Sequence, residues 1–384
     1  MNDYITMLGT GNALANRCYN TCFTLHSEKG ILLVDAGGGN GILTQLEKAG
    51  IMREVISDLF VTHAHTDHLL GCIWVIRMAL EDGKSLRVWS HAKVLNLLTS
   101  ICQQILPKNQ AENMEELVTM HLLEDGDKFE AGGFPLQCFD IHSTKERQFG
   151  FEAQLSDGRR LCCLGDEPFS TQCRQYAEGT DWLMSEAFCL YEDRNRFLPY
   201  EKHHSTVLDA ARLAEELRVK NLILYHTEDR TLDTRCERYT MEADVLVCGS
   251  PNYCGYPSAA LRAFMERMEF PAVNYSDYSK PVVLKRICSA TIYTMNCPNE
   301  EVYRQMNYHV LMDTAANQLG VFGPTEILCS YDTYQFSNYD RYDAATFSEA
   351  HKAEVRDNQF PIDLEKAYEL GKRLVGKCDK NREV

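Results

Sequence analysis

The chain has 384 residues and an ordinary globular composition, 45% hydrophobic and 24% charged, which excludes a disordered, fibrous or collagen-like protein. Its length allows two or three domains with sizeable buried cores. The formal net charge of −16 argues against a general nucleic-acid coat, because a phosphate backbone attracts basic surfaces.

The start of the chain and its cysteines favour a cytosolic protein. Met1-Asn2-Asp3 lacks the basic-then-apolar order of a secretion signal, and no apolar run is long enough to span a membrane. The sixteen cysteines include no C-x-x-C pair, so neither a zinc ribbon nor an iron–sulfur cluster is indicated. We expect buried free thiols, a cytoplasmic location and no membrane partner.

Up to about Tyr239, short β-like runs alternate with loops that carry glycine and histidine. These runs are residues 31–34, 58–61, 136–141, 160–164 and 221–225. The last four each lead to a histidine or an acidic residue. A rigid β scaffold commonly presents catalytic side chains at strand ends, so we expect a functional site in this part of the chain.

The strongest signal is the motif Thr62-His63-Ala64-His65-Thr66-Asp67-His68, directly after the second of these runs. Neutral imidazole and carboxylate are both good zinc ligands. Four such groups within six positions are too close to spread along one helix face. We therefore expect a loop in which they converge on two adjacent metal ions.

Three further candidates each follow a later β run: His142, Asp166 and His226. Each alone is more often structural than functional, but their order behind the first motif favours a shared metal site. Histidines without such a context are expected to be ordinary core or surface residues. These are His26, His91, His121, His309 and His351.

Together these residues resemble the metallo-β-lactamase superfamily, in its ribonuclease Z-like branch, over about residues 1–240. The resemblance also rests on Gly9-Thr10-Gly11, Asp35-Ala36-Gly37-Gly38-Gly39, Gly165-Asp166, Ser185-Glu186-Ala187, His204-Ser205-Thr206 and Tyr225-His226-Thr227. It implies an αββα sandwich, a dinuclear metal site and a hydrolase of ester bonds, in particular phosphodiester bonds. Two zinc ions are implied, with manganese or iron as alternatives, since the same ligand types accept all three.

The resemblance also distributes the ligands between the two ions. One ion would be held by His63, His65 and His142, the other by Asp67, His68 and His226, and Asp166 would bridge them. A metal-bridging hydroxide would then attack the phosphoryl group in line. Asp67 would orient that hydroxide, and Asp35 would fix the tautomer of a ligating histidine.

A second group of residues, separate from the metal ligands, is expected to act on the leaving group. His204 stands before Ser205-Thr206, either of which could cap the helix that follows. In ribonuclease Z-like enzymes the matching histidine and glutamate, here His204 and Glu186, help to protonate the leaving oxygen. The alternative is that His204 belongs only to the capping region. The Ser-Thr spacing favours His204 over the adjacent His203.

One departure from the family concerns the substrate. Processing of tRNA relies on an extended basic arm, whereas the segment between Asp166 and His204 is short and acidic on balance. We therefore expect a small phosphodiester or nucleotide-like substrate, such as bis(p-nitrophenyl) phosphate or a cyclic nucleotide, and not tRNA.

From about Ala243 the pattern changes to longer βα units. A strand at 244–248 leads into a helix with apolar residues at Leu261, Phe264, Met265 and Met268. A strand at 282–292, a helix from about Asn299, a strand at 325–329 and a closing helix from about Ala344 follow. We expect part of a doubly wound parallel sheet, with domains at 1–242 and 243–384.

This second part resembles the flavodoxin-like, NADPH-dependent FMN reductase family. The resemblance rests on the run from Ala243 to Tyr253, on Gly255, on Thr294-Met295-Asn296 and on Phe360-Pro361-Ile362-Asp363. It implies flavin contacts from loops at Ser250, Pro251, Asn252, Tyr253, Thr294, Met295 and Asn296. The match begins at the third strand of that fold, so the phosphate-binding strand and loop have no counterpart. We expect no bound FMN.

The missing strand leaves a sheet edge and an apolar face that the hydrolase part or a second protomer could cover, so we expect a homo-oligomer. Two alternatives stay open. A lactamase-like domain before a flavodoxin-like domain also describes flavodiiron oxygen or nitric oxide reductases, although these carry a carboxylate where this chain has His65. The second part could also be a non-catalytic interaction domain beside a hydrolase.

Overall fold

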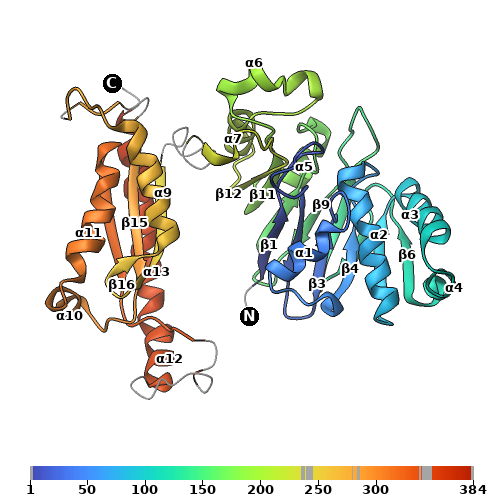
Figure 1. Cartoon of the computed structure of the whole chain (residues 1–384), viewed down its shortest axis with the longest axis horizontal. Coiled ribbons are helices and arrows are strands. Elements are labelled where there is room, and N and C mark those ends of the chain that lie inside the picture. Colours follow the sequence, from blue (N-terminus) through green and yellow to red (C-terminus); the bar gives the residue numbers. More distant parts are fainter. Residues whose placement is uncertain are drawn as a thin grey trace. The chain divides into compact units, whose positions relative to one another are not determined.

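The computed structural model describes residues 3–234, 238, 245–278, 280–282, 286–336, 339 and 348–381. The chain forms two compact units, Met1–Leu232 and Asp233–Val384, and each is described by itself (Figure 1). The expected domain boundary between residues 242 and 243 lies outside the described residues.

The first unit contains two six-stranded sheets. The first sheet has the order β1-β2-β3-β4-β5-β6. Its strands are β1 (Tyr4–Gly9), β2 (Cys22–His26), β3 (Ile31–Val34), β4 (Ile56–Phe60), β5 (Leu86–Ser90) and β6 (Val118–Leu122). β1 to β3 pair antiparallel, and β3 to β6 pair parallel. The carboxyl ends of the parallel strands therefore meet at one edge.

The second sheet has the order β12-β11-β10-β9-β8-β7. Its strands are β7 (Lys128–Ala131), β8 (Phe134–Asp140), β9 (Phe149–Gln154), β10 (Arg160–Cys163), β11 (Trp182–Glu186) and β12 (Asn221–Tyr225). β10, β11 and β12 are parallel, and β7 to β10 are antiparallel. The β runs expected in this unit are therefore all strands, with ends shifted by at most two residues.

Side chains point alternately to the two faces of each strand, so the buried apolar residues of the first unit form two separate layers. Leu32 and Val34 of β3 pack between the two sheets with Phe151 of β9, whereas Leu33 packs outward among the helices. Because both faces of these strands are buried, β3 appears in the sequence as a continuous apolar run.

Helices cover the outer face of each sheet. On the first sheet lie α1 (Gly41–Lys48), α2 (Thr66–Glu81), α3 (Ala92–Ile105) and α4 (Lys108–Leu117). The second sheet carries α5 (Arg174–Ala177) and α7 (Val207–Glu216), and α6 (Arg194–Phe197) lies in the connection before α7 (Figure 1). The first unit is thus an αββα sandwich, as the sequence predicted.

The second unit is built on a four-stranded sheet with the order β14-β13-β15-β16. β13 (Val245–Tyr253), β15 (Cys288–Thr294) and β16 (Thr325–Ser330) are parallel, and β14 (Tyr256–Pro257) turns back against the end of β13. The helices are α9 (Ala259–Glu269), α10 (Glu300–Gln305), α11 (Tyr308–Gln318), α12 (Glu349–Asn358) and α13 (Phe360–Asn381).

This sheet is covered on both faces. α9 and α11 pack on one face through Met265 and Met312, and α13 packs on the other through Leu370 and Leu374. The result is a partial parallel α/β layer structure, as predicted, and its flavodoxin-like identity stays a prediction. The expected strand at 282–292 begins later, at Cys288. The expected closing helix is divided into α12 and α13, and the start expected near Ala344 lies outside the described residues.

Seven short 3₁₀ turns complete the described elements: η1 (Arg53–Val55), η2 (Thr171–Cys173), η3 (Tyr191–Asp193), η4 (Tyr200–Lys202), η5 (Leu232–Thr234), η6 (Phe270–Ala272) and η7 (Leu319–Val321). The described cysteines are free thiols. In the part of the chain that the structure describes, every helix is too short or too polar to cross a membrane.

Candidate metal centre

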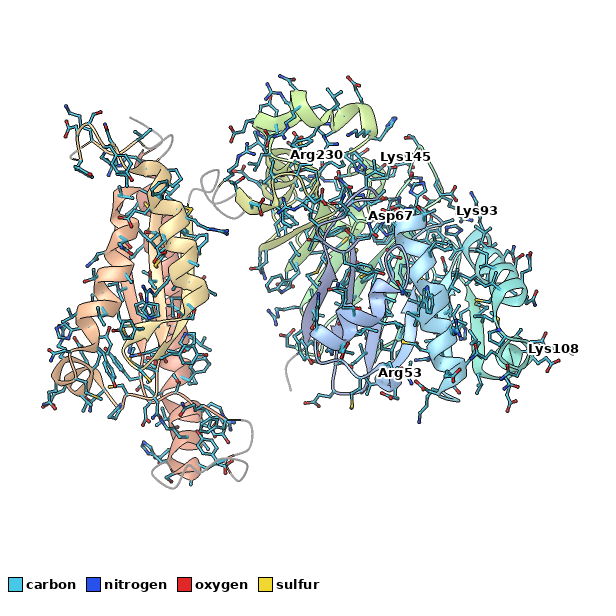
Figure 2. The ribbon with its side chains drawn as sticks, in the orientation of Figure 1. Arg53, Asp67, Lys93, Lys108, Lys145 and Arg230 are labelled. Atoms are coloured by element: carbon cyan, nitrogen blue, oxygen red, sulfur yellow. The ribbon has the colours of Figure 1, made fainter. Side chains whose placement is uncertain are left out.

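The histidine-rich motif lies where β4 passes into α2. His63 and His65 belong to the loop after the strand, and His65 is the residue before the helix. Asp67 and His68 lie in the first turn of α2, which corrects the expectation that the whole motif forms a loop. Figure 2 labels Asp67 near this amino end of α2. The motif therefore combines two loop residues with two residues of a helix start.

Two groups of three side chains bring their donor atoms within 4.8 Å of one another. One group is His63, His68 and Asp166, and the other is Asp67, His68 and His226. All five residues are buried. The fold thus brings together residues from the β4–α2 junction, from the loop after β10 and from the end of β12.

Asp166 lies at the centre of this cluster. Its Oδ2 atom is 3.5 Å from Nε2 of His63, 3.5 Å from Nε2 of His68 and 3.6 Å from Nε2 of His226. Asp67 Oδ2 lies 3.4 Å from Nε2 of His68. A carboxylate between several imidazoles is the arrangement expected of a ligand shared by two cations.

The other two predicted ligands lie outside both groups. His65 is half-buried, and its Nδ1 atom lies 2.8 Å from Nε2 of His63. The side chain of His142 is exposed, while its backbone N–H donates to Oδ1 of Asp140 over 2.8 Å. The structure therefore brings His65 beside the cluster and leaves His142 at the surface.

Unpaired polar atoms show that the cluster suits a metal ion. Asp67 Oδ2 and His68 Nε2, which lie 3.4 Å apart in the cluster, are buried without a hydrogen-bond partner. A buried polar atom without a partner costs about 1–3 kcal/mol, so two of them in one place call for a compensating ligand. Imidazole nitrogen and carboxylate oxygen fit zinc, manganese or iron.

Burial and neighbouring charges set the protonation of the cluster. Burial lowers the pKa of His63 well below its usual value and lowers that of His226 to about 3, so both imidazoles are neutral and able to bind a metal. Burial alone would raise the pKa of Asp166, but the neighbouring imidazole of His68, whose own pKa lies well above its usual value, holds the pKa of Asp166 well below its usual range. The carboxylate is therefore ionised.

Asp35 contacts the metal cluster through His68 and the β4–α2 loop through Thr62. It follows β3 with a left-handed backbone, φ 53°, which is uncommon outside glycine. Its Oδ1 accepts the backbone N–H of Thr62 over 2.8 Å, and its Oδ2 accepts the Thr62 hydroxyl over 2.8 Å. Oδ2 also lies 2.7 Å from Nδ1 of His68. This contact leaves Nε2 of His68 directed at the cluster.

His204 and Glu186 form a second buried pair. Nδ1 of His204 lies 3.4 Å from Oε2 of Glu186, and neither atom has a hydrogen-bond partner. Oε1 of Glu186 accepts the N–H and the hydroxyl of Ser205, each over 2.6 Å. Burial raises the pKa of Glu186. The ring of His204 lies 5.1 Å from that of His226, so this pair borders the cluster.

The local structure explains how His204 is held. Thr206 caps α7 and forms a reciprocal capping box with Asp209, which selects Thr206 among the two expected caps. The His204 ring stacks on Phe188 with a centroid distance of 5.0 Å. His203, in contrast, is exposed and has a left-handed backbone.

Three supporting residues were not predicted from the sequence: Thr62, Gln148 and Phe188. Gln148 is fully buried, donates to Asp166 from Nε2 and accepts the Asp166 N–H at Oε1 over 3.0 Å. No sequence motif identifies Gln148, because its role depends on the pairing of strands β8 and β9 beside the β10 loop. Thr62 is the first residue of the histidine motif, and this position is the sequence signal by which its supporting role could have been predicted.

The candidate flavin contacts lie at the carboxyl ends of two neighbouring strands, where Pro251 pairs in register with Thr294. The expected loop at 250–253 is in fact the end of β13, because the chain continues in register with β15 before it turns into β14. Ser250 Oγ accepts the N–H of Ser258 over 2.9 Å, and Asn252 Oδ1 accepts that of Gly255 over 2.7 Å. These two side chains thus stabilise the turn.

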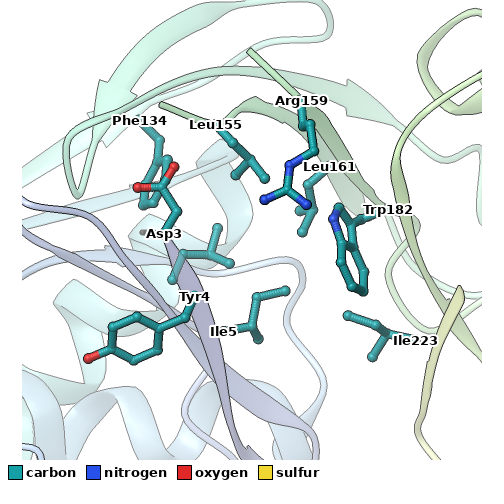
Figure 3. Close-up of a pocket in the computed structure, with 10 residues that line it drawn as sticks. Asp3, Tyr4, Ile5, Phe134, Leu155, Arg159, Leu161, Trp182 and Ile223 are labelled. Carbon is teal, nitrogen blue, oxygen red and sulfur yellow. The ribbon is translucent and has the colours of Figure 1, made fainter. Parts of the chain in front are cut away.

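A separate cavity of about 340 Å³ in the first unit contains none of the candidate metal ligands. Its walls include Tyr4 and Ile5 of β1 and, from the second sheet, Leu161, Trp182 and Ile223 (Figure 3). Because its walls are mostly apolar and hold no metal-binding cluster, we do not assign the chemistry to it.

Comparison with known families identifies relatives of the first unit. The family model described as "Anti-Pycsar protein Apyc1" matches residues 4–245. A ribonuclease Z of Anoxybacillus flavithermus is 31% identical over 293 residues, covering 63% of this chain and 92% of the relative. A ribonuclease Z of Prochlorococcus marinus subsp. pastoris is 25% identical over 281 residues, covering 59% and 88%.

Solved structures are also similar to this chain. The human short-form tRNase Z has a TM-score of 0.49 and 23% identity, and the match covers 60% of this chain and 94% of that one. A diphosphatase of the PhnP family has a TM-score of 0.47 and 17% identity, with coverage of 59% and 87%.

Proposed function

Because the chain belongs to the Anti-Pycsar protein Apyc1 family, within the ribonuclease Z-like branch of the metallo-β-lactamase superfamily, we propose that its first unit is a dinuclear-metal phosphodiesterase for small nucleotide-like substrates. The observation that carries this proposal is the buried cluster of His63, Asp67, His68, Asp166 and His226, with its unpaired donor atoms. The hydrolase would occupy residues 1–242 and act in the cytosol.

The proposed ligands follow the two groups in the cluster. His63 and His65 would hold one ion, and Asp67, His68 and His226 would hold the other, with Asp166 between them. His142 is proposed as the remaining ligand of the first ion on the family resemblance alone, since its side chain is exposed. We propose zinc as the metal, with manganese or iron as alternatives.

Two bound metal ions would lower the pKa of a water molecule and neutralise the phosphoryl oxygens during in-line attack. The residues around them would orient the reacting groups. Asp67 has its Oδ2 atom unpaired and could accept a hydrogen bond from the attacking water. Asp35 would keep Nε2 of His68 free as a ligand by holding Nδ1.

His204 would donate a proton to the leaving oxygen. Glu186, held by Ser205, faces Nδ1 of His204 and so orients the imidazole. The other nitrogen, Nε2, would then serve the leaving group. The ring distance of 5.1 Å between His204 and His226 supports this placement beside the metal ligands.

A small substrate is favoured by the chain between Asp166 and His204, which is short and acidic on balance. The relatives named ribonuclease Z favour phosphodiester hydrolysis over the flavodiiron reductase alternative. Among small phosphodiesters we propose cyclic nucleotides, with bis(p-nitrophenyl) phosphate as an artificial substrate.

The test uses the purified full chain, stripped of metal and reloaded with zinc or manganese. We expect hydrolysis of bis(p-nitrophenyl) phosphate and of at least one cyclic mononucleotide, with far less turnover of an unprocessed tRNA. A metal-loaded preparation that is inert toward every phosphodiester would reject the proposal, and efficient tRNA cleavage would reject its substrate class.

A further inference from the structure

The cavity of about 340 Å³ in the first unit lies at the end of the sandwich opposite to the candidate metal centre. Its walls include Tyr4 at the start of β1, Leu161 near the start of β10 and Trp182 at the start of β11. Asp166 and His226, in contrast, follow the carboxyl ends of β10 and β12. Because β10, β11 and β12 are parallel, the cavity and the metal centre lie at opposite edges of the same sheet.

The last strands of the two sheets, β1 and β12, explain why a space remains here. Beyond their carboxyl ends the chain joins them, because Thr227 N–H donates to the carbonyl of Thr10 over 2.8 Å and Asn12 N–H donates to that of Thr227 over 3.0 Å. At their amino ends the two strands belong to different sheets, and in the described residues no backbone hydrogen bond joins them. Ile5 of β1 and Ile223 of β12 therefore border a gap between the sheets.

The walls of the cavity are mostly apolar. Leu25, Phe134 and Leu161 belong to the buried core between the sheets, and Leu155 packs against that core. At about 30 Å³ for each water-sized group, the cavity has room for a ligand of about ten non-hydrogen atoms. Filling it with an apolar group is favourable, because the apolar walls are then removed from water.

Arg159 brings a positive charge to the cavity. It lies in the turn between β9 and β10, and Figure 3 shows its guanidinium group directed inward between Leu155 and Leu161. Its Nε atom donates to Oδ2 of Asp157 over 2.7 Å, whereas its two Nη groups make no hydrogen bond to the described residues. This edge of the guanidinium group matches a carboxylate, which it binds through two parallel N–H···O bonds.

Asp3 brings a hydrogen-bond acceptor to the same end of the cavity. Its Oδ2 atom accepts the N–H of Ser156, in the β9–β10 turn, over 2.6 Å, and its Oδ1 atom is buried without a hydrogen-bond partner. Figure 3 shows Asp3 on the β1 side of the cavity and Arg159 on the side of the second sheet. A buried oxygen without a partner is unfavourable, so a ligand that donates to Oδ1 gains from the contact.

We propose that this cavity binds a free α-amino acid with an apolar side chain of the size of leucine or phenylalanine. The carboxylate of the amino acid would bind the Nη groups of Arg159, its ammonium group would donate to Oδ1 of Asp3, and its side chain would fill the apolar part. A carboxylic acid without the ammonium group would leave Oδ1 unpaired and place a second negative charge near Asp3. An amine without the carboxylate would leave the Nη groups of Arg159 unpaired.

Isothermal titration calorimetry with the purified full chain tests the class of ligand. L-Phenylalanine should bind, and three analogues that each lack one part should bind at least tenfold more weakly. Glycine lacks the side chain, phenylpropionate lacks the ammonium group, and phenethylamine lacks the carboxylate. If phenylpropionate or phenethylamine bound as tightly as phenylalanine, the ligand class would be wrong. If neither leucine nor phenylalanine bound, the proposal would be overturned.

Two variants test the place of binding. Arg159→Gln should weaken phenylalanine binding at least tenfold and leave that of phenethylamine unchanged, whereas Asp3→Asn should weaken phenylalanine binding and leave that of phenylpropionate unchanged. The matched control is Arg174→Gln on α5, because Arg174 is similarly exposed, 37% against 44% for Arg159, and also pairs with an acidic residue, but does not line the cavity. A phenylalanine affinity that neither cavity variant changes would place the amino acid elsewhere and overturn the proposal.

Trp182 provides an independent signal, because its indole ring lines the cavity. Saturation with phenylalanine should change the tryptophan fluorescence of the wild type and leave that of Trp182→Phe unchanged. A change that persists in Trp182→Phe would come from Trp74 or Trp89, the other two tryptophans, and would contradict binding in this cavity. No change in the wild type would contradict it as well.

Discussion

At the residue scale, Asp35 connects the metal cluster to the rest of the first sheet. It holds Thr62 and His68 through three contacts of 2.7–2.8 Å. Asp35→Asn should lower zinc affinity about 10–100-fold, because residues that orient a metal ligand commonly contribute that much. Zinc affinity would be measured by competition with a chromophoric chelator.

A matched control for this variant is Asp58→Asn. Asp58 is also a buried carboxylate of the first sheet, but it contacts Arg87 and Trp89 instead of the cluster. Its variant should reduce stability and leave zinc affinity unchanged. Equal zinc affinities for Asp35→Asn and the wild type would show that Asp35 does not position His68.

His204 allows a prediction about the leaving group. His204→Ala should lower kcat for a cyclic nucleotide by about 100-fold or more, because its alkoxide leaving group needs a proton. The effect on bis(p-nitrophenyl) phosphate should be much smaller, since nitrophenolate leaves without protonation. Steady-state kinetics at constant metal content would measure both.

The neighbouring His203 provides the control for this comparison. It is exposed, and its ring lies near Thr144 and not in the cluster. His203→Ala should change neither substrate's kcat. An equal loss with both substrates in His204→Ala would assign His204 a structural role.

The sequence predicted the residues of the metal site more reliably than the residues that hold them in place. His63, Asp67, His68, Asp166 and His226 could be found because motif and order are local properties of the chain, and the fold brings them together. The role of Gln148 could not be predicted, since it arises from contacts between segments distant in sequence. The exposed position of His142 likewise depends on the conformation of its loop.

At the scale of elements, the close approach of α2 to the chain after β3 positions Asp67 and His68. Gly71 makes this approach possible: its N–H donates to the carbonyl of Gly37 over 2.8 Å, and an added Cβ would lie 1.8 Å from the carbonyl oxygen of Ala36. Gly71→Ala should therefore lower the free energy of unfolding by about 1–3 kcal/mol or more and weaken metal binding by shifting α2.

Chemical denaturation and a zinc titration would measure these two effects. Gly39→Ala serves as the comparison, because an added Cβ there would meet nothing within 4 Å. If both alanine variants matched the wild type in stability, the close packing of α2 would not be needed.

Strands were predicted more reliably than the segments between them. Runs such as Ile31–Val34 are short, apolar and bounded by polar residues, and these local features suffice. The start of α2 and the extension of β13 through Tyr253 were not predicted. Both depend on tertiary contacts: the helix start is set by packing, and the strand end by its pairing with β15.

At the scale of the whole molecule, metal binding should contribute to stability. The unpaired atoms of Asp67 and His68 lose their compensation when metal is removed. Since a ligand that binds only the folded state stabilises it by about 4 kcal/mol at 1,000 times its Kd, a chelator should lower Tm by several degrees. Stoichiometric zinc should restore it, as followed by scanning calorimetry. An unchanged Tm after chelation would argue against a metal in this cluster.

Two structurally different units could be predicted from the sequence, because short β runs with long loops give way to longer βα units near residue 243. The residue pattern also predicted a sheet edge without a partner strand, and in the described residues β13 pairs with β15 on one side and only with the short β14 on the other.

The most direct test of the central claim is an anomalous-difference map at the zinc absorption edge from crystals of the zinc-loaded protein. Two peaks should lie among His63, Asp67, His68, Asp166 and His226, on either side of the Asp166 carboxylate. Zinc bound only elsewhere, or no peak within this cluster, would contradict the account.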